Sequence, residues 1–185
     1  MSSHEKQKEL SKQWLSDSLM ELMKSKPYSE ITVSEIAARA DLSRRTFYRA
    51  FASKDEIINH IAERLVREYL KEITTPVPLD MKSMAFVFFG FFERHKEFLL
   101  TLRRNHMESF ILESFNRYLP YIRSQACKDK ISDDPRVNKF FALMSGGAFF
   151  NLLMDWLEND SDLTVEELSC LVNESAKVFL KYNIQ

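Results

Sequence analysis

Three short motifs fix where helices begin in this chain of 185 residues. In each, Thr or Ser is followed three positions later by Glu, at Thr32–Glu35, Ser53–Glu56 and Thr164–Glu167. In such a capping box the hydroxyl accepts a hydrogen bond from a backbone N–H of the first turn, and the Glu carboxylate accepts one from the backbone N–H of the cap residue. The sequence is therefore organised as successive helices with their own start signals.

Apolar residues recur at helical spacing along the chain, and helix breakers are rare. Only three glycines and five prolines occur. Over residues 3–25 the apolar stripe consists of Leu10, Trp14 or Leu15, Leu19, and Leu22 with Met23. The same period predicts later helices over about 54–74, 80–94, 96–104, 107–126, 136–159 and 164–182. We expect an all-α fold of about nine helices.

Composition excludes several classes of protein. Hydrophobic residues make up 45% of the chain, enough for a packed core. Cys127 and Cys170 make no disulfide framework and no CxxC pair, which indicates two ordinary thiols in a reducing cytoplasm. The N-terminus has no apolar segment, and the longest apolar run, 84–92, is far shorter than the ~20 residues of a membrane span. We expect a soluble cytoplasmic protein without a membrane partner.

Sequence motifs of enzymes are absent. The chain has no G-x-S-x-G, no phosphate-binding glycine loop and no H-E-x-x-H. His106 and Glu108 give H-x-E, but the P-C-x-x-C of zinc deaminases does not follow. We expect no catalytic residues, no cofactor and no metal.

Charge is divided unevenly along the chain. Residues 1–54 hold ten Lys and Arg against seven Asp and Glu, a balance of +3, and the remainder has a balance of −4. The formal net charge is −1, which does not suit a general polyanion binder. A basic N-terminal part on an acidic remainder favours a local nucleic-acid surface.

Residues 32–51 are predicted to form a helix-turn-helix. Thr32 opens a short helix whose inward side chains are Val33, Ile36, Ala37 and Ala40. A tight turn at Asp41 and Leu42 leads to a second helix, capped by Ser43, that buries Phe47, Ala50 and Phe51. Small alanines permit the close crossing of two helices that this motif requires.

The second of these helices carries arginines where the helix dipole disfavours them. Arg44 and Arg45 lie in its first turn, where a cation is mismatched by about 0.3–1 kcal/mol. A DNA duplex would compensate, because recognition helices enter the major groove by their N-terminal residues and arginine pairs with guanine. The alternative is an amphipathic helical hairpin with a solvated basic face.

Residues 31–58, ITVSEIAARADLSRRTFYRAFASKDEII, resemble the DNA-binding signature of the TetR family of transcriptional regulators. The resemblance is strong over about residues 8–60 and weaker beyond. It implies a head, residues 1–54, that binds double-stranded DNA, joined by a helix over 54–74 to a regulatory and dimerisation domain over 75–185. Pro76 and Pro78 mark the linker. Asp41 departs from the glycine that many relatives carry in the turn, and Asp tolerates the left-handed region.

The resemblance also implies a site and partners. By position, the DNA-contacting residues are Ser34, Ser43, Arg44, Arg45, Thr46, Tyr48, Arg49 and Lys54. We expect a homodimer on a near-palindromic operator, and a repressor released by a small apolar or aromatic effector. The alternative is a regulator or activator whose body binds a protein partner.

The C-terminal part offers two further candidate sites. Residues 145–159 are similar to one branch of TetR-type C-terminal regions, which includes regulators associated with dihydroxyacetone kinase operons. Glycines inside an apolar helix suggest close helix approach at a dimer seam, or packing within one subunit. The seam candidates are Gly146, Gly147, Phe149, Phe150, Leu153, Trp156, Leu157, Leu168, Leu171 and Val172. Effector-pocket candidates are Phe88, Phe89, Phe92, His106 and Phe110, for which the alternative is a plain core.

Overall fold

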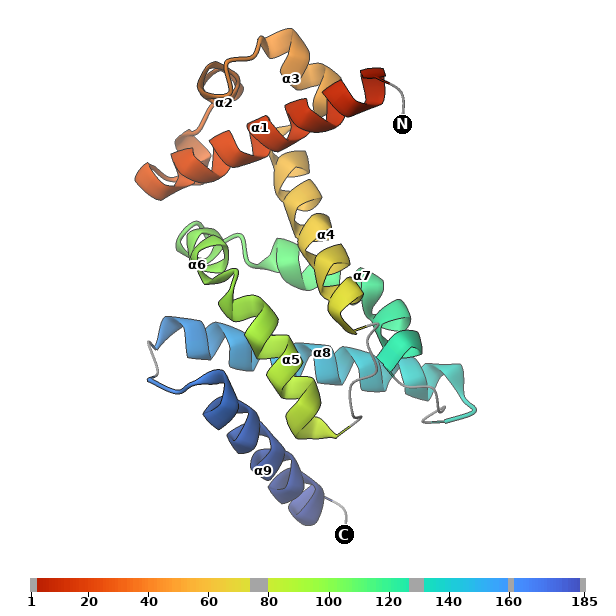
Figure 1. Cartoon of the computed structure of the whole chain (residues 1–185). Helices are drawn as coiled ribbons and strands as arrows, with labels where there is room; N and C mark the ends of the chain where they lie inside the picture. Colours follow the sequence, from red (N-terminus) through yellow and green to blue (C-terminus); the bar gives the residue numbers. More distant parts are fainter. Residues whose placement is uncertain (1–2, 74–79, 127–131, 160–161, 184–185) are drawn as a thin grey trace. The chain divides into compact units, whose positions relative to one another are not determined.

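A computed structural model describes residues 3–73, 80–126, 132–159 and 162–183 (Figure 1). These residues form nine α-helices and one short 3-10 turn, with no strand, so the predicted all-α class is confirmed. The helices are α1 (Ser3–Ser25), α2 (Val33–Arg39), α3 (Arg44–Ala50), α4 (Lys54–Ile73), α5 (Met81–Glu93), α6 (Lys96–Arg104), α7 (Ser109–Ala126), α8 (Pro135–Glu158) and α9 (Val165–Asn183). The 3-10 turn η1 (Tyr28–Glu30) precedes α2. The predicted linker prolines lie outside the described residues.

The chain packs as two compact units. The first consists of residues 1–64 and 97–111, and the second of residues 65–96 and 112–185. Helix α4 begins in the first unit and ends in the second. Helix α6 belongs to the unit that contains the N-terminal helices, which no local sequence pattern indicated.

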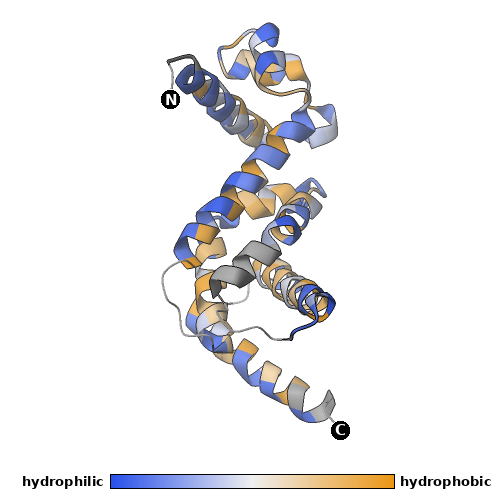
Figure 2. Ribbon diagram, turned by 90° about the vertical axis from the view of Figure 1, so that its right-hand side faces the viewer, coloured by the Kyte–Doolittle hydropathy of each residue, from blue (hydrophilic) through white to orange (hydrophobic). Residues whose placement is uncertain are grey.

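In the first unit, α1 packs on α2 and α3, which also pack on each other. The predicted inward face of α3 is confirmed, because Phe47 and Phe51 are buried. Bands of hydrophobic and hydrophilic residues alternate along the helices (Figure 2). On α1 the predicted stripe is confirmed at Leu15 and Leu19, which are fully buried, so that Trp14 is the exposed alternative at 47%. Leu10 was predicted in the stripe but is also 47% exposed.

The side chain of Asn105, directly after α6, bonds the end of α1 and the 3-10 turn. The Asn105 carboxamide oxygen accepts a hydrogen bond from the backbone N–H of Tyr28 at 2.7 Å. The amide nitrogen of Asn105 donates to the carbonyl oxygens of Thr101 at 2.9 Å and Met23 at 3.4 Å. The end of α1 and the 3-10 turn are thereby held against the end of α6.

The second unit has an aromatic core. The Tyr69 ring lies 5.9 Å from Phe88 and 6.1 Å from Phe92, and Phe89 lies 6.0 Å from Trp156, measured between centroids. Edge-to-face and offset pairs of this kind stabilise beyond the area they bury. Burial raises the pKa of the Tyr69 phenol well above its ordinary value. The three phenylalanines proposed for an effector pocket are therefore packed ring to ring.

The other two pocket candidates lie in the first unit. His106 is exposed and has a positive φ of 55° in the turn after α6. Phe110 is half-buried near the start of α7. The five candidates are thus divided between the two units.

Helix α8 exposes an unusual amount of apolar surface. Its central window has a mean hydropathy of 1.3 and is only 33% buried, so by length and composition it would pass as a membrane span. Core helices of soluble proteins pass the same test. The exposed apolar side chains of α8 are Val137, Phe140, Phe141, Leu143, Met144 and Leu152.

Candidate nucleic-acid interface

The start of α2 is fixed by the predicted capping box. The Thr32 hydroxyl accepts from the backbone N–H of Glu35 at 3.2 Å, and the Glu35 carboxylate accepts from the backbone N–H of Thr32 at 2.8 Å. Lys26, after the end of α1, pairs with the same carboxylate at 2.6 Å. Its ammonium group, together with the Thr32 bonds, lowers the pKa of Glu35 to about 2.

The turn between α2 and α3 has a defined geometry. The backbone N–H of Leu42 donates to the carbonyl of Ala37 at 2.9 Å, and that of Asp41 to Ala38 at 3.1 Å. Asp41 has a φ of 54°. This pairing is the Schellman motif, in which the residue after the cap is left-handed. The expectation that Asp replaces glycine here is confirmed.

Helix α3 begins at the predicted cap. The Ser43 hydroxyl accepts from the backbone N–H of Thr46 at 3.1 Å and lies 2.9 Å from the Thr46 hydroxyl. The two hydroxyls proposed to meet DNA thus pair with each other in the free protein. No acid lies in the first turn of the helix.

The outward face of α3 carries three guanidinium groups and a phenol. Arg44, Arg45, Tyr48 and Arg49 are exposed. Within the described residues, no carboxylate pairs with any of the three arginines. Tyr48 is 54% exposed, and its ring packs edge-on against Phe47 at 5.3 Å. Phe47, in the core, therefore positions Tyr48 on the outward face of α3. That exposed face is open to an anionic partner.

Ser34 is also exposed, in the first turn of α2. Of the eight predicted contact residues, six have exposed side chains: Ser34, Ser43, Arg44, Arg45, Tyr48 and Arg49. Thr46 is half-buried.

Lys54 has an internal role in the structure. Its ammonium nitrogen lies 2.6 Å from the carbonyl oxygen of Tyr28 and 2.9 Å from that of Ile31. It also lies 4.2 Å from the centre of the Tyr28 ring. An ammonium group has three donors. In the DNA-free protein, the Lys54 ammonium group therefore directs most of its donors at the turn before α2.

Tyr28 joins three elements and was not identified from sequence. Its backbone N–H is bound by Asn105, its carbonyl by Lys54, and its hydroxyl donates to the Asp55 carboxylate. Burial and the Asp55 hydrogen bond raise the pKa of the phenol far above its ordinary value. The nearest sequence signal is Pro27, since proline disfavours helix at the residue before it, and that signal predicts no long-range contact.

Most dimer-seam candidates are buried within their own subunit. Gly146, Phe150, Leu153, Trp156, Leu157, Leu168 and Val172 are buried, and Phe149 packs on Phe88 and Phe89. The Trp156 indole N–H donates to the carbonyl of Leu163 at 3.1 Å. Leu171 is 51% exposed, and a Cβ added at Gly147 would meet no atom within 4 Å. Packing within one subunit therefore buries most of the side chains that the sequence pattern had offered for a dimer seam.

Residues 15–61 match the family described as "Bacterial regulatory proteins, tetR family". Among solved structures, the chain is similar to "Dihydroxyacetone kinase operon activator DhaS", with a TM-score of 0.55 and 18% identity over 92% of this chain and 94% of that one. It also matches a TetR transcriptional regulator from Rhodococcus sp. RHA1, with a TM-score of 0.49 and 14% identity over 96% and 98%. Curated protein sequences give no significant match. At these identities the structural likeness concerns the fold.

Proposed function

We propose, from the match of residues 15–61 to the TetR family of bacterial regulators, that the protein is a transcriptional regulator that binds a specific DNA operator through α3. The observation that carries the proposal is the outward face of that helix, where the exposed guanidinium groups of Arg44, Arg45 and Arg49 have no carboxylate partner among the described residues. An arginine guanidinium can donate two hydrogen bonds to one guanine, to O6 and to N7, and it also pairs with phosphates. The proposed head is residues 1–54, with residues 75–185 as the regulatory and dimerisation domain.

We further propose that the regulator is a homodimer on a near-palindromic site. The support is the exposed apolar face of α8, where Phe140 and Met144 are 64% and 67% exposed. Gly147 lies one turn further along that face, with space beside it. On α9, Leu171 and Val178 are 51% and 55% exposed. Burial of apolar surface contributes about 25 cal/mol per Å² to association. A second copy of the chain that packs on this surface would therefore be stabilised by burying it.

The dimer proposal replaces the buried seam candidates by the exposed ones. Its seam consists of Val137, Phe140, Phe141, Met144, Gly147, Leu171 and Val178, on α8 and α9. Two-fold symmetry then sets the two recognition helices about 34–36 Å apart, one turn of duplex.

For the output, we propose a cytoplasmic, non-enzymatic repressor that a small apolar or aromatic effector releases from DNA. Such an effector would have to open the aromatic cluster around Phe88, Phe89 and Phe92. Activation is the second candidate, because the chain shares its fold with a protein described as an operon activator. A regulatory domain that binds a protein partner instead of a small effector is compatible with either repression or activation.

The test begins with selection of bound fragments from the genome of origin. We expect one enriched motif with two-fold symmetry, occupied by a dimer in sedimentation experiments. A monomer at micromolar concentration that binds one half-site as tightly as the full site would contradict the dimer. Enrichment of no motif would contradict sequence-specific binding.

The effector is tested separately. Compounds that stabilise the protein thermally are titrated with and without the selected DNA. If the effector lowers the affinity of the protein for DNA, thermodynamic linkage requires that DNA lower its affinity for the effector by the same factor. The coupling free energy is typically about 1–3 kcal/mol. Affinity unchanged by DNA would leave the aromatic cluster as a plain core. A promoter fused to a reporter, with the regulator present or deleted, separates repression from activation.

A further inference from the structure

Asn105 directly follows the last residue of α6, at a turn of fixed geometry. The backbone N–H of Met107 donates to the carbonyl oxygen of Leu102 at 2.9 Å, and that of His106 donates to the carbonyl oxygen of Arg103 at 2.9 Å. His106 lies in the left-handed region, with a φ of 55°. Glycine is the usual residue at this position of a helix end, and a side chain persists there only where surrounding contacts fix the backbone. The turn therefore presents Asn105 in one orientation.

The carboxamide of Asn105 bonds backbone groups of three separate segments. Its oxygen accepts from the N–H of Tyr28 at 2.7 Å, in the 3-10 turn before α2. Its nitrogen donates to the carbonyl oxygens of Thr101 on α6 at 2.9 Å and of Met23 near the end of α1 at 3.4 Å. Both amide hydrogens are thus directed at carbonyls, and the oxygen is left for the N–H of Tyr28. One side chain therefore fixes the turn before α2 relative to α1 and α6.

Tyr28 in turn contacts the start of α4. Its carbonyl oxygen accepts from the Lys54 ammonium group at 2.6 Å, and its hydroxyl donates to the Asp55 carboxylate. Lys54 also donates to the carbonyl oxygen of Ile31 at 2.9 Å, two residues before α2 begins. Helix α3, the proposed recognition helix, lies in the chain between α2 and α4. The helices on either side of it are therefore held together through the Tyr28 turn.

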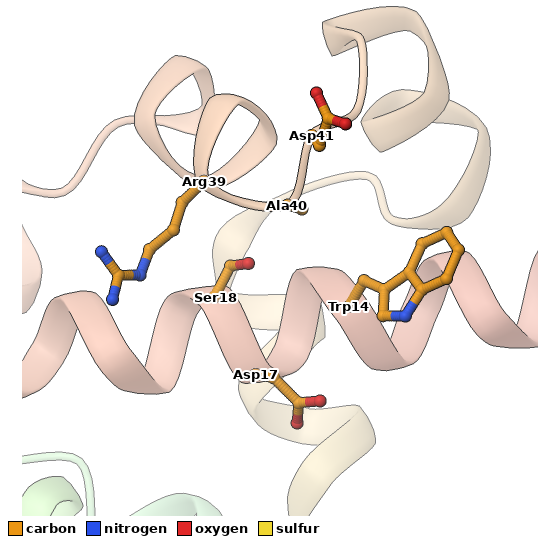
Figure 3. Close-up of a pocket in the computed structure, with 6 residues that line it drawn as sticks. All are labelled: Trp14, Asp17, Ser18, Arg39, Ala40 and Asp41. Atoms are coloured by element: carbon orange, nitrogen blue, oxygen red, sulfur yellow. The ribbon is translucent and has the colours of Figure 1, made fainter.

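The end of α2 has a looser polar contact than its start. It borders a pocket of about 380 Å³ beside α1 (Figure 3). Arg39 extends from this end toward α1, but its guanidinium nitrogen lies 3.9 Å from a Glu21 carboxylate oxygen, and both side chains are half-exposed. Exposed ion pairs of this kind contribute little to stability. The closer polar contacts of α2 are therefore those at its start, next to Tyr28.

We propose that Asn105 is a positioning residue for operator binding, an inference that rests on the proposed DNA-binding function. Asn105 fixes the Tyr28 turn, and through Lys54 that turn sets the relative position of the two helices that flank α3. Readout of base edges requires donors of α3 at hydrogen-bonding distance, whereas attraction to phosphates tolerates displacement. Loss of the Asn105 carboxamide therefore lowers the affinity for the operator more than the affinity for random duplex.

The test measures the affinity of the full-length protein for the selected operator and for a random duplex of equal length, by fluorescence anisotropy at fixed salt. Asn105→Ala should lower the ratio of the two affinities by about two- to tenfold, the net contribution of one hydrogen bond. Asn105→Asp keeps the oxygen that accepts from Tyr28, and it should keep most of the parent's ratio, because its added charge repels both duplexes alike.

Asn159→Ala is the matched control and should keep the parent's ratio. Asn159 also follows a helix end, but its carboxamide bonds the Asp155 carboxylate of its own helix, α8. A partly unfolded variant binds both duplexes in proportion to its folded fraction, which a titration at stoichiometric operator concentration measures. A reduced active fraction of Asn105→Ala with the parent's ratio would therefore overturn the proposal. So would a ratio in Asn105→Asp as low as that in Asn105→Ala.

The double variant tests the route through Lys54. If Asn105 acts through the Tyr28 turn on Lys54, Asn105→Ala should change the ratio less in the Lys54→Met background than it does alone. Fully additive losses would overturn the proposed route. If the parent enriches no duplex, the operator proposal itself fails. A parent that binds its operator, with an Asn105→Ala variant that keeps the parent's ratio, would refute the positioning role alone.

Discussion

The ammonium nitrogen of Lys54 lies 2.6 Å from the carbonyl oxygen of Tyr28, and this contact joins the first residue of α4 to the turn before α2. The backbone N–H of the same tyrosine is bound by Asn105 at the end of α6. A residue that sequence position alone assigned to DNA therefore also stabilises the unit that presents α3.

We predict that Lys54→Met destabilises the protein as well as weakening DNA binding. The change leaves the carbonyls of Tyr28 and Ile31 without their charged donor, at a cost of about 1–3 kcal/mol. Urea unfolding followed by circular dichroism measures the loss. Arg45→Met, an exposed cation without an internal partner, is the control and should unfold as the parent does. If Lys54→Met unfolds at the same urea concentration as the parent, the Lys54 contacts do not stabilise the fold and its role is confined to DNA binding.

Asn105→Ala should loosen the turn before α2. It removes the acceptor of the Tyr28 N–H, and an unsatisfied buried donor costs about 1–3 kcal/mol. We expect faster hydrogen exchange at the Tyr28 amide, with exchange in the core of the second unit unchanged. Asn105→Asp keeps the acceptor oxygen and should preserve most of the protection. If alanine leaves the Tyr28 amide equally protected, this hydrogen bond does not hold α6 to the turn.

Arg44→Ala and Arg45→Ala should each cost about 1–3 kcal/mol at the selected operator if the arginine contacts guanine. The loss on random duplex should be smaller, because phosphate contacts carry no sequence information. Fluorescence anisotropy at fixed salt compares the two. Arg39→Ala, on α2 and paired with Glu21, serves as control. Equal losses on operator and random DNA would reduce these arginines to phosphate contacts.

Gly147→Ala distinguishes a dimer seam from a free surface. Apart from the backbone of its own helix, a methyl group there meets no described atom of the subunit within 4 Å, and alanine favours helix by about 1 kcal/mol over glycine. The isolated subunit should therefore become more stable. If a partner helix packs at this position, the dimer should nevertheless dissociate more readily in sedimentation equilibrium. Gly90→Ala, next to Val165 within the subunit, is the control. An unweakened dimer would place Gly147 outside the seam.

Stability at low pH should depend on Glu35. Its folded-state pKa of about 2 lies below its ordinary value of 4.5, since Lys26 and Thr32 bind the charged form. The carboxylate therefore stabilises the fold above about pH 4.5, and that contribution is lost as pH falls through about 2. Glu35→Gln should flatten the loss of stability between these values. Parallel acid-unfolding curves for parent and variant would contradict this assignment.

The helices themselves were predictable from local signals. Thr32 and Thr164 begin helices through the predicted capping boxes, and the Thr164 box is closed at 2.9 and 3.2 Å. Phe47 and Phe51 occupy the inward face of α3 because the period of the apolar residues follows from helix geometry. Helix caps and apolar faces depend only on residues within one or two turns of each other. The sequence alone therefore suffices to predict them.

The tertiary structure decided which of two adjacent apolar residues was buried and which polar groups met over long separations. On α1, Leu15 is buried and Trp14 exposed, although the period admits either. On α8, Leu153 is buried whereas Met144 is 67% exposed. Asn105 meets Tyr28 across 77 positions. No local propensity encodes such contacts, because they depend on how whole helices pack against one another.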